Sequence, residues 1–173
     1  MRKLHKKYSK PRQIFNRPRI EEEDGLVKQY GLKNKKEIWK ADSEITRIRR
    51  KAKNFLRESQ EKQEMFLAKL KQKGFAVDSL DDVLSLKIED LLKRRLQTVL
   101  FSKRIANTSR QARQLIVHKK VLVGSNIINI PSYIVPLELE DKIKLITKIK
   151  KEKEKKVEIA QIENIEEKTE GED

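Results

Sequence analysis

The chain has 173 residues, of which 36% are hydrophobic, 40% charged and 5% aromatic. So little apolar material excludes one large core and favours two small cores joined by extended basic segments. The 42 Lys and Arg against 27 Asp and Glu leave a formal net charge of +15, which predicts a polyanionic partner. A thermophile surface rich in Lys, Glu and Arg is the alternative, but it predicts nearly balanced charge.

The chain contains no cysteine, which excludes disulfides, thiolate nucleophiles and cysteine-based zinc sites and agrees with an intracellular protein. His5 and His118 lie far apart in the sequence and cannot form a metal site alone. The basic start has no apolar stretch behind it, so we expect that it does not act as a signal peptide. No run approaches the ~20 apolar residues of a membrane span. We expect no metal, no cofactor and no membrane partner.

Residues 1–19 carry eight Lys and Arg and no acid, and Pro11 and Pro18 interrupt any helix there. We predict an extended basic arm that lies along the phosphates of a nucleic acid. The alternative is a disordered, solvated terminus, which we expect in the absence of the partner. The candidate contacts in the arm are Lys6, Lys7, Arg12 and Arg17.

A helical unit is predicted over residues 20–90. The acids at 21–24 suit the first turn of a short helix that ends near Tyr30, with Gly31 as its stop. Asn34 and Glu37 have the spacing of a capping box that opens a long helix. Its apolar positions recur every three or four residues and predict one buried stripe: Ile38, Ala41, Ile45, Ile48, Ala52 and Phe55.

Basic residues off that stripe run from Arg47 to Arg57 with no acid between them. A charge run on a helix is usually a solvated face, and composition alone leaves that alternative open. The missing acids favour RNA contact, for which the candidates are Arg47, Arg49, Arg50 and Lys53. Further helical segments are predicted over 59–73, from Ser79 through residue 84, and as one stretch over 88–102.

After residue 106 the pattern changes. Thr108 or Ser109 caps a helix that runs to about His118. Two β-branched runs, 121–123 and 127–130, flank a turn at 124–126 and predict a hairpin, with further short strands at 134–135 and 143–146. One face of the helix carries Arg110, Arg113, Gln114 and Val117, and Lys119 and Lys120 follow it.

These residue types suit RNA. Arg makes bidentate phosphate contacts, and Lys adds attraction without directional demand. Few aromatics are available to stack on single-stranded bases, so we expect a structured RNA to be recognised by backbone and shape. For Trp39 and Tyr133, packing in a core is the favoured role.

No feature predicts an enzyme. His118 has no Ser, Asp or Glu near it in the sequence to act as nucleophile or orienting partner, so contact with RNA or with helix-end carbonyls is favoured. No nucleotide-binding glycine motif and no zinc-protease motif occurs. We expect no catalytic residue and no small-molecule substrate.

From residue 148 the chain is of low complexity, and we expect a charged, mostly disordered tail. Residues 157–173 hold seven acids and one base. Without them the charge of the remaining chain is about +21.

Three motifs, in this order, resemble the signature of the S-four RNA-binding domain: RRLQT at 94–98, SRQARQLIVH at 109–118 and NIPSYIV at 129–135. More narrowly, residues 8–146 resemble the archaeal and eukaryotic-type S-four family of small-subunit ribosomal proteins, for which the segments 19–23 and 30–37 are typical. The resemblance implies an α+β protein, with a helical N-terminal unit and a small α-L domain of two helices packed on a short β-sheet. We divide the chain into a basic arm (1–19), a helical RNA-binding unit (20–90), an S-four domain (91–147) and a tail (148–173).

The resemblance also implies a function. Such a protein binds the 5′ domain of small-subunit rRNA directly and early in assembly, next to other small-subunit ribosomal proteins. It lies in the cytoplasmic ribosome near the region where mRNA enters, which suggests an influence on translational accuracy. The positions carried over to RNA binding are Arg95, Ser109, Arg110, Arg113, Gln114, His118 and Lys119, with Ser132 and Tyr133 beside them, and charge adds Lys120.

The chain departs from the family pattern at two glycine positions. The helix–hairpin junction often reads His-Gly-His and is His118-Lys119-Lys120 here, and an expected Gly-Leu-Ala is Arg104-Ile105-Ala106. Gly adopts a left-handed backbone at little cost, whereas Lys does not. The zinc-type cysteines of the bacterial branch are absent, so the resemblance implies no structural metal.

Two alternatives come from other classes. An RNA-modifying enzyme such as a pseudouridine synthase can carry the same small domain, but 173 residues leave no second large core for catalysis. A non-ribosomal RNA chaperone or rescue factor that uses the module alone would not explain the match through residues 8–60.

Overall fold

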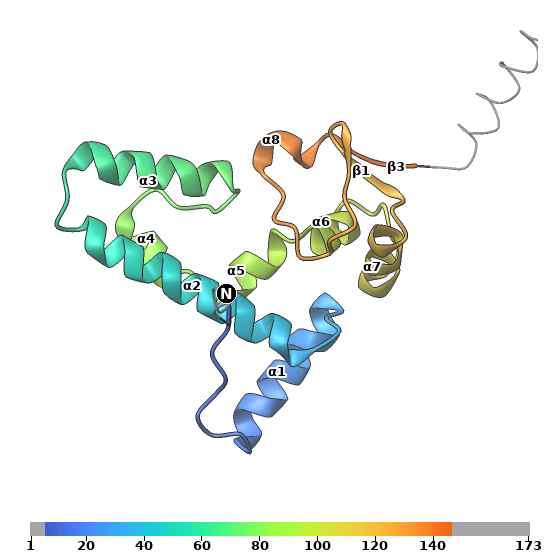
Figure 1. The fold of residues 1–173 in the computed structure, drawn as a ribbon, viewed down its shortest axis with the longest axis horizontal. Coiled ribbons are helices and arrows are strands. Elements are labelled where there is room, and N and C mark those ends of the chain that lie inside the picture. The colour runs from blue at the N-terminus through green and yellow to red at the C-terminus, as the bar shows by residue number, and fades with distance from the viewer. Residues whose placement is uncertain (1–5, 147–173) are drawn as a thin grey trace, which may run out of the picture.

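The structure, a computed structural model, describes residues 6–146, and the tail expected from residue 148 lies outside them. A helical region is followed by a small antiparallel sheet with its own helices (Figure 1), which confirms the predicted α+β class. The elements are α1 (Arg17–Tyr30), α2 (Lys35–Phe55), α3 (Gln60–Gln72), α4 (Leu80–Ser85), α5 (Ile88–Lys93), α6 (Leu96–Ser102), α7 (Ser109–Val117), β1 (Val121–Val123), β2 (Asn126–Ile127), α8 (Leu137–Glu140) and β3 (Ile143–Leu145).

Helix α1 begins inside the segment expected to be extended. Asn16 caps it by accepting a hydrogen bond from the Arg19 amide, and Pro18 occupies the first turn, where its missing N–H leaves no bond unmade. The prediction that Pro18 interrupts a helix was therefore wrong, and the acids at 21–24 are not in the first turn. The predicted stop is confirmed, since Gly31 adopts φ +60° directly after Tyr30.

Helix α2 starts where the sequence predicts, but its capping box does not form. The Asn34 side chain makes no capping hydrogen bond, and the Glu37 carboxylate turns to arginines of later elements instead. The buried stripe is confirmed: Ile45 is 1% exposed and Ala52 is fully buried, while Phe55 at the end of the helix is half-buried.

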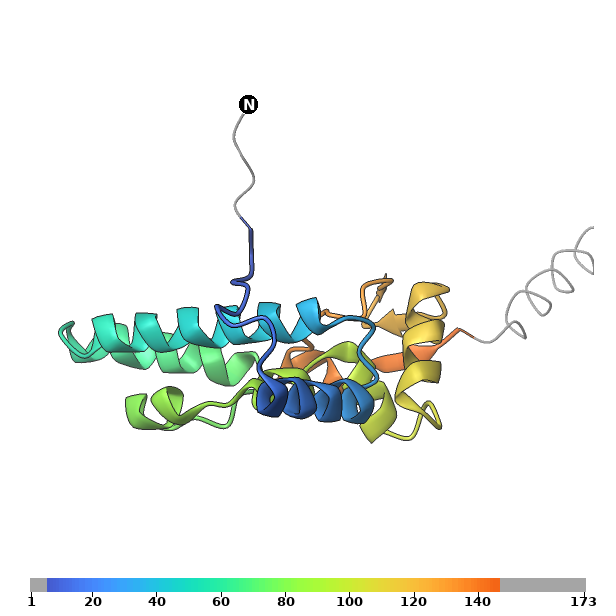
Figure 2. The ribbon, with the colours of Figure 1, turned by 90° about the horizontal axis from the view of Figure 1, so that it is seen from below.

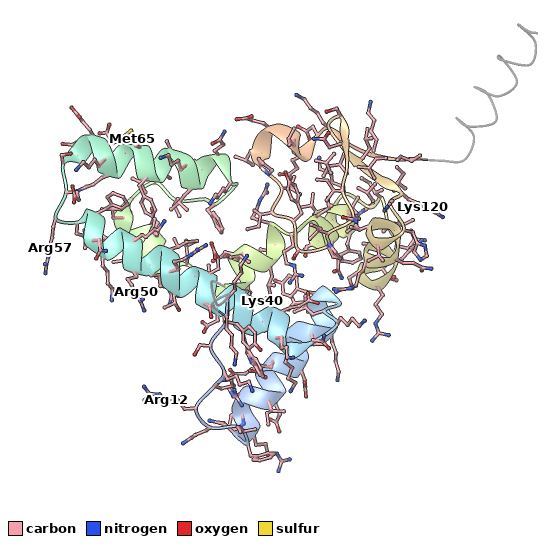
Figure 3. All side chains as sticks on the ribbon, viewed as in Figure 1. Arg12, Lys40, Arg50, Arg57, Met65 and Lys120 are labelled. Carbon is pink, nitrogen blue, oxygen red and sulfur yellow. The ribbon has the colours of Figure 1, made fainter. Side chains whose placement is uncertain are left out.

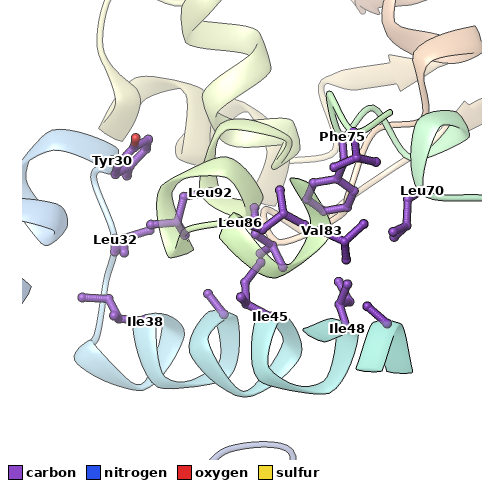
Figure 4. Packing of buried hydrophobic residues seen from close by; sticks show 14 residues of the cluster. Tyr30, Leu32, Ile38, Ile45, Ile48, Leu70, Phe75, Val83, Leu86 and Leu92 are labelled. Carbon is purple, nitrogen blue, oxygen red and sulfur yellow. The ribbon is translucent and has the colours of Figure 1, made fainter. Parts of the chain in front are cut away.

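The first core fills the space between α2, α3, α4 and α5 (Figure 4). Phe55 and Phe66 pack across the α2–α3 hairpin with ring centroids 4.8 Å apart. The predicted opening of α4 is confirmed, because Ser79 and Asp82 exchange capping hydrogen bonds. This core extends from Tyr30 to Leu92.

The stretch 88–102 forms two helices rather than the single one predicted. Arg95 has extended backbone (ψ 141°) and forms an isolated β-bridge with Ile134. The Leu96 amide donates to the Tyr133 carbonyl at 2.8 Å, and the Val135 amide donates to the Arg94 carbonyl at 3.0 Å. These long-range bonds override the local helical pattern. They also explain why 134–135 is part of a bridge and not of the predicted strand.

The sheet has the order β2-β1-β3, with both pairs antiparallel. Strands β1 and β3 confirm the predictions, whereas β2 begins one residue early and ends at Ile127 instead of 130. Helix α8 was not predicted. The second core lies between α6, α7 and the sheet and contains Leu96, Leu100, Ile116, Val121 and Val135.

The turned view shows the elements spread along the long axis, with α2 and α3 toward one end and α7 with the sheet toward the other (Figure 2). The first core ends at Leu92 and the second begins at Leu96, so the chain passes between them at Arg94 and Arg95. The domain boundaries at 19, 90 and 147 stay a prediction. The segment that joins the two cores at Arg94 and Arg95 is short. Side chains of α2 therefore face those of α6 and α7.

Candidate nucleic-acid interface

Helix α7 presents part of its predicted face to solvent. The Thr108 side chain caps it by accepting a hydrogen bond from the Gln111 amide, and Ala112 and Ile116 are fully buried. This anchoring leaves Arg110 and Gln114 exposed, whereas Arg113 is half-buried. Of the two arginines predicted on this face, Arg110 is therefore the one that is exposed to solvent.

The junction between α7 and β1 is a group of exposed bases. We name His118, Lys119 and Lys120 the junction cluster, since all three are exposed and follow one another directly. Lys119 has φ +57°, in the left-handed region, and Arg104 on the other side of α7 has φ +56°. Both stand where the family pattern has Gly. Each of these residues therefore adds a positive charge, but its left-handed backbone costs roughly 1–2 kcal/mol.

Two other predicted arginines meet at an acid that the sequence analysis had assigned to a cap. The Glu37 carboxylate accepts hydrogen bonds from Arg95 and, at 2.9 Å, from Arg113. Arg95 is only 4% exposed, and Arg113 also donates to the Gln97 side-chain oxygen at 3.2 Å. We name Glu37, Arg95, Gln97 and Arg113 the Glu37 knot. It ties α2 to α6 and α7.

The pKa of Glu37 reflects this arrangement. Burial alone would raise that pKa, but the hydrogen bond from Arg113 and the positive charge of Arg95 outweigh it, so the pKa lies below its usual value. Glu37 is therefore ionised at neutral pH. Its charge offsets part of the charge of both arginines.

Gln97 extends the knot into the core. Its side-chain nitrogen donates to the carbonyls of Tyr30, Gly31 and Ser109 at 3.1, 2.9 and 3.0 Å, and the residue is 1% exposed. Ser109, a predicted RNA contact, is half-buried against Gly31, where an added Cβ would come within 2.4 Å of the Ser109 Oγ. Ser109 thus lies at the joint between the two cores.

A cleft of about 490 Å³ opens above the knot between α2 and the loop after β2. It gathers predicted residues from four parts of the chain, namely Lys7, Arg95, Arg113 and Ser132, together with Lys40, which was not predicted. Tyr133 is half-buried and packs against the second core, in agreement with the favoured packing role. Trp39 likewise packs against the first core and donates to Glu23 Oε1 at 3.0 Å.

The basic residues of α2 do not form one uniform surface. Arg50 and Lys53 on α2 and Arg57 in the turn directly after it are exposed, and Figure 3 shows Arg50 and Arg57 projecting away from α3. Arg47 pairs with Glu44 at 2.5 Å, and Arg49 is half-buried and donates to the Leu86 carbonyl. We name Arg50, Lys53 and Arg57 the α2 basic face.

The described part of the arm lies on α2 instead of extending freely. The Ser9 amide donates to Ser43 Oγ at 3.1 Å, and the rings of Tyr8 and Trp39 are 6.2 Å apart. Lys6, Lys7 and Arg12 remain exposed, while Arg17 belongs to α1 and pairs with Glu21 at 3.0 Å. The expectation of a disordered, solvated terminus in the absence of the partner is therefore wrong for the segment around Tyr8.

Sequence reasoning missed Glu37, Gln97 and Lys40. Gln97 could have been found, because it is a lone amide between apolar residues of a buried helix. Glu37 gave a false signal, since its spacing from Asn34 fits a capping box. Across residues 6–146 no cluster of three or more acids or histidines suited to a metal occurs, and no helix of that range could span a bilayer.

Comparison with known proteins agrees with this geometry. The S4 domain family matches residues 94–141, which contain α6, α7 and the β1–β2 hairpin. The small ribosomal subunit protein uS4 of Methanothermobacter thermautotrophicus is 42% identical over 148 residues, covering 82% of this chain and 86% of that protein. The chain belongs to the uS4 family. The uS4 protein of Nanoarchaeum equitans is 41% identical over 155 residues, covering 84% and 86%, and that of Methanococcus aeolicus 42% over 149, covering 82% and 84%.

Membership in the uS4 family confirms the resemblance drawn from the three motifs. These uS4 relatives are named as ribosomal proteins and not as enzymes, in agreement with the expected non-enzymatic role. The RNA contacts of individual residues stay predictions. The structure divides the predicted residues into exposed cations and members of the uS4 chain's internal joint.

Proposed function

We propose that this chain is a structural protein of the small ribosomal subunit in the cytoplasm and that it binds small-subunit rRNA directly. Its uS4 relatives are named as proteins of the small ribosomal subunit. The observation that carries the proposal is that the Glu37 knot joins two cores that each expose cations, the α2 basic face on one and Arg110 with the junction cluster on the other. Two such surfaces at a fixed relation suit a folded RNA with several helices.

The predicted residues then divide into two roles. Arg110, Gln114, the junction cluster, the α2 basic face and the exposed arm residues Lys6, Lys7 and Arg12 contact phosphates, because they are exposed to solvent. Arg95 and Arg113 instead hold the Glu37 knot together, because both pair with the Glu37 carboxylate. Arg47 and Arg17 belong to neither group, because each is exposed but paired with an acid on its own helix.

The proposed target is the 5′ domain of small-subunit rRNA, bound early in assembly by the helical unit (20–90) and the S4 domain (91–147) together. In the subunit the chain would lie next to other small-subunit proteins and near the region where mRNA enters. A change in the Glu37 knot would then alter translational accuracy. The scarcity of exposed aromatic rings supports recognition by shape and backbone. Among the described residues, Phe15 is the aromatic with most exposure, at 93%.

The test is a competition between RNAs. The purified full chain is bound to a transcript of the 5′ domain and then challenged with large-subunit rRNA transcripts of equal length, over a range of salt concentrations. We expect the 5′ domain to bind at least about tenfold more tightly at physiological salt, because specific contacts add to the common electrostatic term. Equal affinity for both RNAs at every salt concentration would contradict the proposal and favour a general RNA chaperone.

A further inference from the structure

The junction cluster carries charge that no described acid balances. Within residues 6–146, neither His118, Lys119 nor Lys120 forms an ion pair. Beside the cluster lies a hollow of about 250 Å³, and the neighbouring Val117 is 54% exposed. The hollow is lined by Gln111, Gln114, Leu115, His118 and Lys120. Cations next to apolar surface suit a ligand that has both carboxylates and aliphatic side chains.

The described chain ends at this place. The Ile146 amide donates to the Lys120 carbonyl at 2.8 Å, so the residues that follow start beside the cluster. Residues 147–156 are ten positions, which span at most about 35 Å when extended. Residues 157–173 can therefore reach the cluster, and a linker of this length gives a local concentration in about the millimolar range.

Residues 157–173 have the matching chemistry. They hold seven acids and one base, and the aliphatic residues Val157, Ile159, Ile162 and Ile165 lie among the acids. We propose that in the RNA-free protein this segment binds the junction cluster, with carboxylates on Lys119 and Lys120 and an aliphatic side chain in the hollow beside Leu115. Bound rRNA displaces it, a step that rests on the proposed function, whereas the docking itself does not.

The linker offers a competing site, since residues 148–156 contain six Lys and two Glu. Lys119 and Lys120 instead lie on a surface that is held by α7, β1 and the bond to Ile146, and the hollow beside them lets docking combine charge with an apolar contact. A weakly attracted polyanion must therefore compete with residues 157–173 for the junction cluster. An RNA that binds the whole basic surface displaces these residues.

The first experiment is zero-length carbodiimide crosslinking of the full chain, which joins carboxylates to lysine amines that touch, followed by mass spectrometry. We expect crosslinks from residues 157–173 to Lys119 or Lys120 at about 50 mM salt, lost at about 500 mM, where the Debye length is only a few ångströms. Crosslinks confined to the linker lysines, or none from this segment, would overturn the proposal. If the crosslinks still form when the 5′-domain transcript is bound before the carbodiimide is added, the displacement step fails while the docking stands; the RNA competition above tests the proposed function separately.

The second experiment compares two variants of equal charge for binding to a generic duplex RNA. One neutralises four acids of the segment (Glu163→Gln, Glu166→Gln, Glu167→Gln and Glu170→Gln), and the control neutralises four exposed acids elsewhere (Asp42→Asn, Glu61→Gln, Glu64→Gln and Glu89→Gln). We expect the first to bind about tenfold more tightly at low salt and the control to gain only about twofold, because only the first empties the cluster. Equal gains would reduce the effect to net charge and refute docking.

Discussion

Glu37 on α2 and Arg113 on α7 are 76 positions apart in the chain, and their side chains meet at 2.9 Å. Arg95 reaches the same carboxylate, so one acid of the helical region holds two arginines of the S4 domain. The RNA-binding face that we propose across both cores would keep its shape only while the Glu37 knot holds. Arg95 and Arg113, which belong to the family motifs, thus make contacts inside the protein.

The first prediction concerns the stability of the joint. Glu37→Gln keeps the size of the side chain and removes its charge, so two poorly hydrated guanidinium groups lose their counterion. We expect the free energy of unfolding to fall by about 2–3 kcal/mol, at the lower end for a buried pair because Arg113 is partly exposed. Glu44→Gln, which breaks the exposed pair with Arg47, is the control and should cost less than about 0.5 kcal/mol in urea unfolding.

The same carboxyl predicts a dependence of stability on pH. Because its pKa in the folded protein is lowered from the model-peptide value of 4.5, the folded state binds its proton less readily than the unfolded state. Its contribution is complete above about pH 4.5 and is lost as the pH falls through the lower pKa of the folded state. The difference in unfolding free energy between the parent chain and Glu37→Gln should therefore shrink in that acid range. A constant difference down to pH 2 would show that Glu37 is not the titrating group.

The two arginines of the α7 face should separate in their effects. Arg110→Ala is expected to flatten the salt dependence of rRNA binding by about one unit of log–log slope, through the loss of one phosphate contact, and to leave stability unchanged. Arg113→Ala should lower the unfolding free energy by about 2–3 kcal/mol as well, because it leaves Glu37 with one partner. Salt titrations of binding, paired with urea unfolding, measure both. Equal stability losses in the two variants would remove Arg113 from the joint.

Local patterns predicted much of this fold, and long-range contacts account for what they missed. The stripe on α2 follows from helical spacing, and Gly31 and Ser79 mark ends that depend on neighbouring residues alone. The interruption of the helix at Arg95 depends on a β-bridge to Ile134, and the local sequence pattern does not indicate a partner 39 positions away. The same holds for the site, since residue type identified Arg95 and Arg113 as important but could not show that an acid from α2 holds them.

A prediction on α2 tests whether the helical core shares in binding. Arg50→Ala with Lys53→Ala should reduce the salt slope by about two units and weaken rRNA binding at low salt, because both residues are exposed on the α2 basic face. Lys69→Ala on α3 with Lys73→Ala directly after it removes equal charge and should change the slope by much less. Similar losses in both pairs would mean that the RNA responds to overall charge rather than to this face.

The last prediction concerns the left-handed backbone at Lys119. Lys119→Gly relieves a conformation that costs a side chain about 1–2 kcal/mol, but it also adds the larger entropy loss of Gly on folding, so a net gain of about 0.5–1 kcal/mol is expected. Lys120→Gly has no such strain to relieve, since Lys120 is not among the positive-φ residues of the described range, and should be neutral or destabilising. Both variants lose one cation of the junction cluster and should flatten the salt dependence of rRNA binding by about one unit. Thermal unfolding then separates the two residues while RNA binding does not, and a destabilised Lys119→Gly would show that contacts of the Lys119 side chain outweigh the strain of its backbone.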